Sequence, residues 1–149
     1  MLIKKNKAEF INCNLAGFGH ADGFLVLKEM RPGDKLLMLR EEDNPHDHDA
    51  IALFYVPKGE FPKGATRHNV DKYKHALHVG YIPASENNKL ATFLDMGYID
   101  AFECIITNIN RDAHPNSQVQ LRVNLLKKES HAHEGVNKAN NNAVRKVMC

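Results

Sequence analysis

Residues 35–56 read KLLMLREEDNPHDHDAIALFYV, and this stretch predicts two β-strands joined by a charged turn. Both ends, 35–40 and 51–56, are rich in leucine, β-branched and aromatic residues, which is typical of strands. Asn44, Pro45 and the aspartates between these ends favour a turn, because proline fixes φ and aspartate bonds its own backbone. The turn carries five carboxylates and two histidines. Binding and catalytic groups concentrate on loops that rigid strands hold, so this turn is the first place to expect a site.

The composition is typical of one globular domain, with 149 residues of which 43% are hydrophobic and 26% charged. The apolar runs are far shorter than the ~20 residues that a membrane helix needs. The basic start, residues 1–7, has no apolar segment behind it, so a secretory signal is not predicted. We therefore expect a cytoplasmic protein.

The three cysteines, Cys13, Cys104 and Cys149, are odd in number and form no C-x-x-C pair. This spacing predicts neither a disulfide framework nor a structural zinc site. No cofactor is expected from the sequence.

The formal net charge of +2 is unevenly distributed. Residues 127–149 hold five Lys or Arg against two Glu, and residues 57–77 hold five basic against two acidic groups, so the remainder is net acidic. A protein that coats duplex nucleic acid usually has a broad basic face on its folded part. Any nucleic-acid binding by the core should therefore be local and depend on geometry.

Six strands are predicted, at 8–15, 35–40, 51–56, 78–82, 101–110 and 119–127. Residues 24–30 are apolar without a clear period, so a strand and a short helix both stay open. Residues 57–77 contain two prolines, two glycines and many charges, which predicts an extended, mobile loop. A loop of this length is usually functional or disordered.

The one substantial helix is predicted at 83–96. Ser85 suits its N-cap, and Gly97 suits its C-terminal stop. Its apolar face is expected to comprise Leu90, Phe93 and Leu94. The resulting fold class is mainly β: a small, modified OB-like or SH3-like six-stranded β-barrel over residues 1–128, with this helix after the Val-Gly strand. Residues 129–149 are polar and without apolar period, so we expect a disordered tail.

Three motifs in this order resemble a known family: GDKLLMLREEDNPHDHDAI at 33–51, VGYIP at 79–83 and ENNKLATFLDMG at 86–97. A glycine-rich loop, GFGHADG at 17–23, precedes them. Together they resemble the HIRAN domain over roughly residues 8–127. The resemblance implies a modified OB-like barrel that, in its best-understood members, recognises the free 3′-hydroxyl end of single-stranded DNA.

The resemblance also implies roles for individual residues. Asp47 would accept the terminal hydroxyl, and His46 would stack on the end base. His20 in the first loop would be a second stacking ring, and Tyr81, after the glycine of the Val-Gly strand, would line the same pocket. Well-studied members have tyrosines where this chain has His46 and His20, and a histidine ring offers less stacking area.

Three further residues complete the expected nucleic-acid-binding set. Asn44 opens the family's Asn-Pro turn. Arg40 occupies the family's arginine before the turn, where we expect it to hold the turn by pairing with Glu41 or Asp49, with phosphate contact as a second role. Lys89 on the helix could contact a phosphate or remain a solvated charge.

An aspartate suits the reading of a strand end rather than the gripping of a polyanion. It accepts an O–H bond worth about 1.5–3 kcal/mol when charge-assisted. The same charge repels a 3′-phosphate or a continuing strand. Stacking at about 1–3 kcal/mol per base would supply affinity without sequence preference.

The working hypothesis is a non-enzymatic module that binds single-stranded DNA 3′ ends in repair or replication, with a DNA-processing protein as a possible second partner. Several alternatives stay open. Asp47 could simply cap its own turn, and Tyr81 could be half-buried core. The same pocket could instead bind a peptide, or His46, Asp47, His48 and Asp49 could hold a divalent metal in a hydrolase-type site.

Overall fold

The computed structural model describes residues 6–18, 27–57, 61, 63–70, 73 and 75–128. In the described residues the strands follow the predicted order, with an α-helix between the fourth and fifth strands. The elements are β1 (Lys7–Asn14), β2 (Lys35–Arg40), β3 (Ile51–Tyr55), β4 (Leu77–Tyr81), α2 (Asn88–Asp95), η4 (Ile99–Ala101), β5 (Phe102–Ile109), η5 (Pro115–Ser117) and β6 (Val119–Leu126). The mainly β fold class and the strand positions, within a residue or so, are confirmed.

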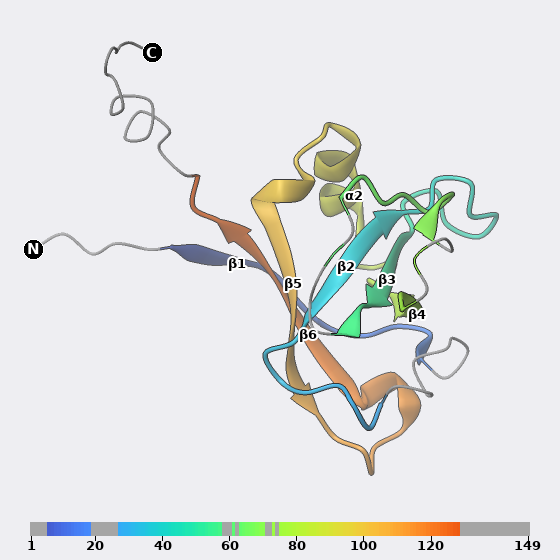
Figure 1. Cartoon of the computed structure of the whole chain (residues 1–149), viewed down its shortest axis with the longest axis vertical. Coiled ribbons are helices and arrows are strands. Elements are labelled where there is room, and N and C mark those ends of the chain that lie inside the picture. The colour runs from blue at the N-terminus through green and yellow to red at the C-terminus, as the bar shows by residue number, and fades with distance from the viewer. Residues whose placement is uncertain are drawn as a thin grey trace, which may run out of the picture.

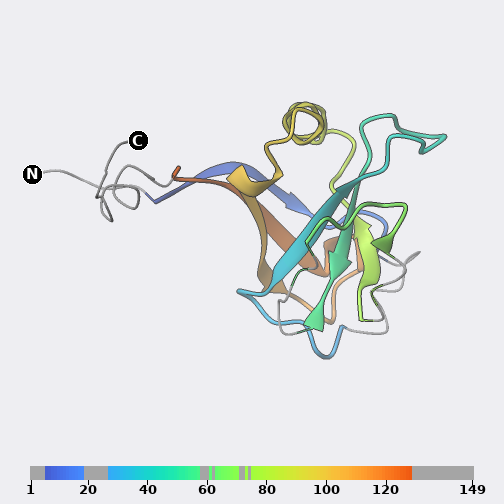
Figure 2. The ribbon, with the colours of Figure 1, turned by 45° about the horizontal axis from the view of Figure 1, so that its top comes forward.

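The six strands form one antiparallel sheet in the order β1-β6-β5-β2-β3-β4. The sheet twists and curls so strongly that its two edges approach each other (Figures 1 and 2). Ala16, just after β1, meets Tyr81 at the end of β4 through two N–H···O bonds of 2.9 Å. Among the described residues this isolated bridge is what joins the two edges, so the sheet is curled like the predicted barrel but is not closed by a ladder.

Two apolar clusters explain why β2 and β3 are apolar throughout rather than alternating. The inner cluster fills the curled sheet and includes Leu36, Met38, Ile51 and Leu53. The outer cluster comprises Leu37, Leu39, Ala52, Phe54 and Val70. Because both faces of these two strands are covered, every position along them favours an apolar residue.

Residues of the 57–77 segment contribute to the outer cluster, which the sequence did not predict. The described part of this segment packs on the sheet rather than extending away from it, with Val70 only 1% exposed and Ala65 against the outer cluster. Thr66, Asn69 and Val70 form local turns through backbone bonds of 2.9–3.2 Å. Sequence composition missed this because one buried valine among charged residues leaves no period.

The helix is shorter than predicted. It begins at Asn88, after a turn in which the Glu86 N–H donates to the Pro83 carbonyl, so Ser85 is not its N-cap. The C-terminal stop at Gly97 is confirmed: Gly97 has φ +93°, its N–H donates to Leu94, and the Tyr98 N–H donates to Phe93. This is a Schellman ending.

Phe93 is also placed differently from the prediction. Leu90 is fully buried and Leu94 packs against the core, but Phe93 is 39% exposed. Its ring lies 5.9 Å from that of Phe10, 5.6 Å from Phe102 and 6.0 Å from Tyr98, between ring centres. Phe93 therefore closes the margin of the core by aromatic contacts instead of entering it.

The remaining predictions fall on the edges of the described chain. Residues 27–29 form a turn rather than a strand or helix. Residues 19–26, with His20, and the predicted tail at 129–149 lie outside the described residues. Among the described residues, no helix is both long and apolar enough to cross a membrane.

The bridge between Ala16 and Tyr81 requires a glycine at position 80. Gly80 has φ +155°, and a Cβ there would collide with the Ala16 carbonyl oxygen and lie 2.9 Å from the Leu15 side chain. Since the Ala16 carbonyl also accepts the Tyr81 N–H, the backbone cannot retreat without breaking the bridge.

We expect Gly80→Ala to lower the free energy of unfolding by about 1–3 kcal/mol more than Gly64→Ala, because it adds overpacking to an unfavourable φ. Gly64 also has a positive φ, +72°, but a Cβ there meets nothing within 4 Å. Urea denaturation of the two variants measures the difference. Equal losses would contradict the clash at the bridge.

Candidate nucleic-acid interface

The turn between β2 and β3 is shaped by its own side chains, as predicted. Asn44 Oδ1 accepts the N–H groups of His46 at 2.8 Å and Asp47 at 3.1 Å. Asp47 Oδ1 accepts the Asp49 N–H at 2.9 Å. These side chains mimic backbone turns and hold the segment in one conformation.

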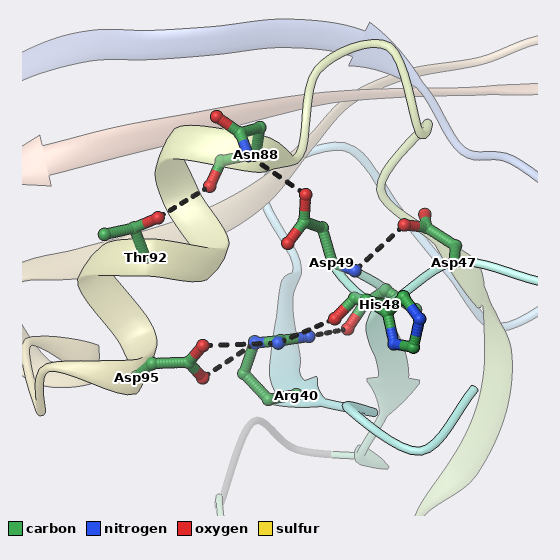
Figure 3. A network of polar contacts seen from close by, with 8 residues as sticks. Arg40, Asp47, His48, Asp49, Asn88, Thr92 and Asp95 are labelled. Atoms are coloured by element: carbon green, nitrogen blue, oxygen red, sulfur yellow. Dashed lines mark hydrogen bonds and ion pairs between the residues drawn. The ribbon is translucent and has the colours of Figure 1, made fainter. Parts of the chain in front are cut away.

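Two asparagines join this turn to the start of α2. Asn87 Nδ2 donates to Asp47 Oδ2 at 2.8 Å, and Asn88 Nδ2 donates to Asp49 Oδ2 at 3.0 Å, the latter seen in Figure 3. The first turn of α2 has no acidic residue of its own. The two aspartates therefore place negative charge near the positive end of the helix dipole, where it is stabilised.

Arg40 holds the other side of the turn, but not through the predicted partners. Its guanidinium pairs with Asp95 at the end of α2, at 2.8 and 3.2 Å, rather than with Glu41 or Asp49. It also donates to the carbonyls of Ala50 at 2.6 Å and His48 at 2.9 Å (Figure 3). These bonds use four of the five guanidinium N–H groups. The turn-holding role stands, and little capacity is left for a phosphate.

Glu41 is a second anchor that the sequence reasoning did not include among the site residues. Its buried carboxylate accepts bonds from Asn44 Nδ2 at 2.8 Å, the Tyr81 hydroxyl at 2.8 Å and Arg67 Nε at 2.6 Å. Burial alone would raise the pKa of Glu41, but these three donors and the Arg67 charge outweigh it and lower the pKa. The period of β2 could have indicated this position, because residues 37, 39 and 41 share the outer face.

Tyr81 stands where the turn, β4 and the first loop meet. Its ring packs against the outer cluster and lies 4.9 Å from the His78 ring. A Cβ built on Gly17, at the start of the first loop, would lie 3.8 Å from Tyr81 Cδ1. Burial, followed by the hydrogen bond and charge of Glu41, raises the pKa of Tyr81 to about 12. Tyr81 is thus half-buried: its ring packs on the outer cluster, and its hydroxyl lies beside the turn.

The remaining candidates on the described chain are exposed. His46, His48 and Lys89 all face solvent. The His48 imidazole points away from α2, whereas its carbonyl faces Arg40 (Figure 3). Within the described ranges, no three His, Cys, Asp or Glu side chains converge as metal ligands. The carboxylates of Asp47 and Asp49 are instead bonded to asparagine amides.

A hollow of about 320 Å³ lies beside the turn. Its walls are Glu41, Asp43, Asn44, Pro45, Arg67 and His68. Asn44 and Pro45 thus border open space beside the turn. The turn is accessible while its backbone is fixed.

The model of the HIRAN domain matches residues 9–126, which is most of the chain. The chain belongs to the HIRAN family. HIRAN domains are DNA-binding modules and are not themselves catalytic, so membership supports a nucleic-acid partner. No curated protein sequence matches the chain significantly.

Two solved structures are similar to this HIRAN domain. A protein from Lactobacillus plantarum is 21% identical, with a TM-score of 0.57 over 82% of this chain and 97% of that one. The HIRAN domain of human HLTF is 13% identical, with a TM-score of 0.49 over 96% of this chain and 98% of that one. The first likeness supports the fold alone.

The lowered pKa of Glu41 predicts a pH-dependent contribution to stability. A carboxyl whose pKa is lower in the folded protein stabilises the fold above its ordinary value of 4.5, and this is lost as pH falls through the folded value. At pH 7 we expect Glu41→Gln to lower the free energy of unfolding by about 1–3 kcal/mol, since charged hydrogen bonds are lost. The difference from wild type should shrink as pH falls below about 4.5.

Thermal denaturation between pH 3 and 7 measures this effect. Glu42→Gln is the matched control, because Glu42 is the exposed neighbour on the same turn. A loss in Glu41→Gln that stays constant down to pH 3 would show that the charge does not stabilise the turn.

Proposed function

We propose that this HIRAN domain binds the free 3′-hydroxyl end of single-stranded DNA at the turn formed by residues 44–49, without catalysing a reaction. The observation that carries the proposal is the hydrogen bonding of the Asp47 carboxylate. Each of its carboxylate oxygens accepts one protein hydrogen bond, so about two acceptor positions of an ionised carboxylate remain. Asp47 is only partly buried, so a ligand can reach them.

The anchoring of Asp47 suits this role because the acceptor is held before the ligand arrives. Asn87, which donates to Asp47, is 1% exposed and therefore has little freedom to move. A preorganised acceptor loses less conformational freedom on binding. The bonds that cap the turn thus support hydroxyl binding rather than compete with it.

The charge around the turn favours an end over an internal site. Glu42, Asp43 and Asp49 surround Asp47 in sequence, and a phosphate next to them would be repelled. A terminal hydroxyl carries no charge and donates a hydrogen bond. Processes that expose 3′ ends, such as repair or replication, are the setting that we propose for this module.

The first test is the preference for a 3′-hydroxyl over a 3′-phosphate, measured by fluorescence anisotropy with two otherwise identical short oligonucleotides. We expect the wild-type protein to bind the hydroxyl end about tenfold or more tightly, as one charge-assisted bond allows. Asp47→Asn should lose this preference, because the amide can no longer act only as an acceptor.

Asp49→Asn is the matched control for Asp47→Asn. Asp49 lies on the same turn and is bonded to Asn88 as Asp47 is to Asn87, so it carries the same charge and a similar structural bond. It should keep the end preference. If both variants bind hydroxyl and phosphate ends as wild type does, Asp47 does not read the end.

A second test concerns base stacking by His46. The ring is exposed on the turn next to Asp47. His46→Ala should weaken binding of a 3′-hydroxyl oligonucleotide by about 1–3 kcal/mol, and His46→Tyr should bind more tightly than wild type because its ring offers more stacking area. His48→Ala is the control and should change little. Equal affinities for all four proteins would remove His46 from the site.

A further inference from the structure

The sheet splits between β2 and β5. Only Lys35 and Leu36 of β2 pair with β5, at Ile105 and Cys104. Residues 37–40 are paired with β3 on one side, and the described chain places no strand on their other side. One edge of β2 is therefore open over about two-thirds of its length.

The register shows which backbone groups face this gap. The Glu41 N–H donates to the Ala50 carbonyl, so the alternate positions 39 and 37 face β3 in the same way. The N–H and C=O groups of Met38 and Arg40 then point towards the gap. Within the described ranges, no backbone or side-chain hydrogen bond reaches these groups. Unpaired strand-edge groups are a template for another strand.

A groove follows this open edge. Hollows of about 320, 300 and 760 Å³ lie in a row, the first two sharing Arg67 and His68, and the last two sharing Leu39, Ala65 and Ile99. The widest hollow is lined largely by apolar side chains, among them Leu37 and Phe61. The groove thus offers apolar surface beside unpaired backbone groups.

The charges along the groove argue against a nucleic-acid strand as its occupant. Among the described residues, its lining holds four basic side chains, Lys35, Arg40, Lys63 and Arg67, and five acidic ones, Glu41, Glu42, Asp43, Asp100 and Glu103. Arg40 and Arg67 are already paired with Asp95 and Glu41. A phosphate backbone needs an excess of cations, which this lining lacks.

In the described chain, the wide end carries two lysines, Lys35 and Lys63, and two acidic side chains, Asp100 and Glu103. The exposed Lys63 lies there, and Lys35 is 3.6 Å from Glu103, whose carboxylate is already bound by Lys7 at 2.8 Å. Because Lys7 and Lys35 share Glu103, this end can complement a single carboxylate rather than a polyanion. A ligand that combines apolar side chains, backbone hydrogen-bonding groups and a local acidic end is a peptide.

We propose that the groove binds an extended peptide segment of another protein, which adds a strand to the open edge of β2 at Met38 and Arg40. Its apolar side chains pack on Leu37 and Leu39, and its acidic end lies at Lys35 and Lys63. The narrow end of the groove borders Asn44 and Pro45 of the turn, but Asp47 does not line it. The domain can then bind a partner protein while the 44–49 turn binds a DNA end.

The test uses ¹⁵N NMR of the whole chain with the synthetic peptide acetyl-TVTVTVEE-amide. The acidic residues are C-terminal because all neighbours in this sheet run antiparallel, which brings that end to Lys35. We expect shifts at the amides of Met38 and Arg40 and slower hydrogen exchange there, with His46 and Asp47 unchanged. The control peptide is N-methylated at alternate residues on the edge that faces β2 and should not bind, because it lacks those N–H donors.

A charge exchange tests the orientation. Lys63→Glu should weaken binding of the EE peptide by up to about fivefold, as one exposed ion pair allows. It should strengthen binding of a peptide in which both glutamates are replaced by lysine. Lys128→Glu is the control, since Lys128 is exposed and does not line the groove. Equal binding of the N-methylated peptide, or no change at Met38 and Arg40 at millimolar peptide, would overturn the proposal.

A single-stranded oligothymidylate with a 3′-hydroxyl forms the last arm. It should shift the amides of residues 44–49 and leave Met38, Arg40 and Lys63 unchanged. Shifts at the groove with the oligonucleotide but not with the peptide would make nucleic acid the occupant and overturn the proposal. If the oligonucleotide does not shift the amides of the turn, that result counts against DNA-end binding and leaves the peptide proposal unaffected.

Discussion

The buried carboxylate of Glu41 is the interaction on which the candidate interface depends. It accepts hydrogen bonds from three separate segments. These are the turn through Asn44, β4 through Tyr81 and the 57–77 segment through Arg67. A buried charge is costly unless it is paired and hydrogen-bonded, and all three donors satisfy it here. Because the three segments share one acceptor, displacing any of them would leave the charge under-satisfied. This coupling fixes the turn relative to the sheet.

Most of the charge on the turn stabilises the turn itself. Arg40 bonds two carbonyls of the segment and Asp95 of α2, and Asp47 and Asp49 bond Asn87 and Asn88. A turn held from both sides presents its exposed groups in one arrangement. Structural bonding and ligand binding are therefore compatible at Asp47, because a carboxylate has more acceptor positions than the protein occupies.

The two proposed surfaces of this small fold differ in the interactions that they offer a ligand. The 44–49 turn offers a hydrogen-bond acceptor and an exposed ring, which suit a neutral, donating strand end. The groove beside β2 offers apolar surface and unpaired backbone groups, which suit a peptide. The split between β2 and β5 creates this groove, and the packing of Phe61 and Ala65 on the outer face gives it a second wall.

Local chemistry in the sequence determined the strands, the Asn-Pro turn and the end of the helix at Gly97. Each depends on residues within a few positions of one another, such as the Asn44 bonds to His46 and Asp47. The family resemblance likewise rested on ordered local motifs, and the match over residues 9–126 bears it out.

Only the tertiary structure decided the start of α2, the partner of Arg40 and the cover of the outer face. The helix begins at Asn88 because Asn87 and Asn88 bond aspartates about 40 residues earlier. Arg40 pairs with Asp95, 55 residues away, rather than with the nearer Glu41. Glu41 pairs instead with Arg67 of the 57–77 segment. These choices follow from which polar groups the curled sheet brings into reach, and hydrophobic period and turn propensity carry no information about pairings over that distance.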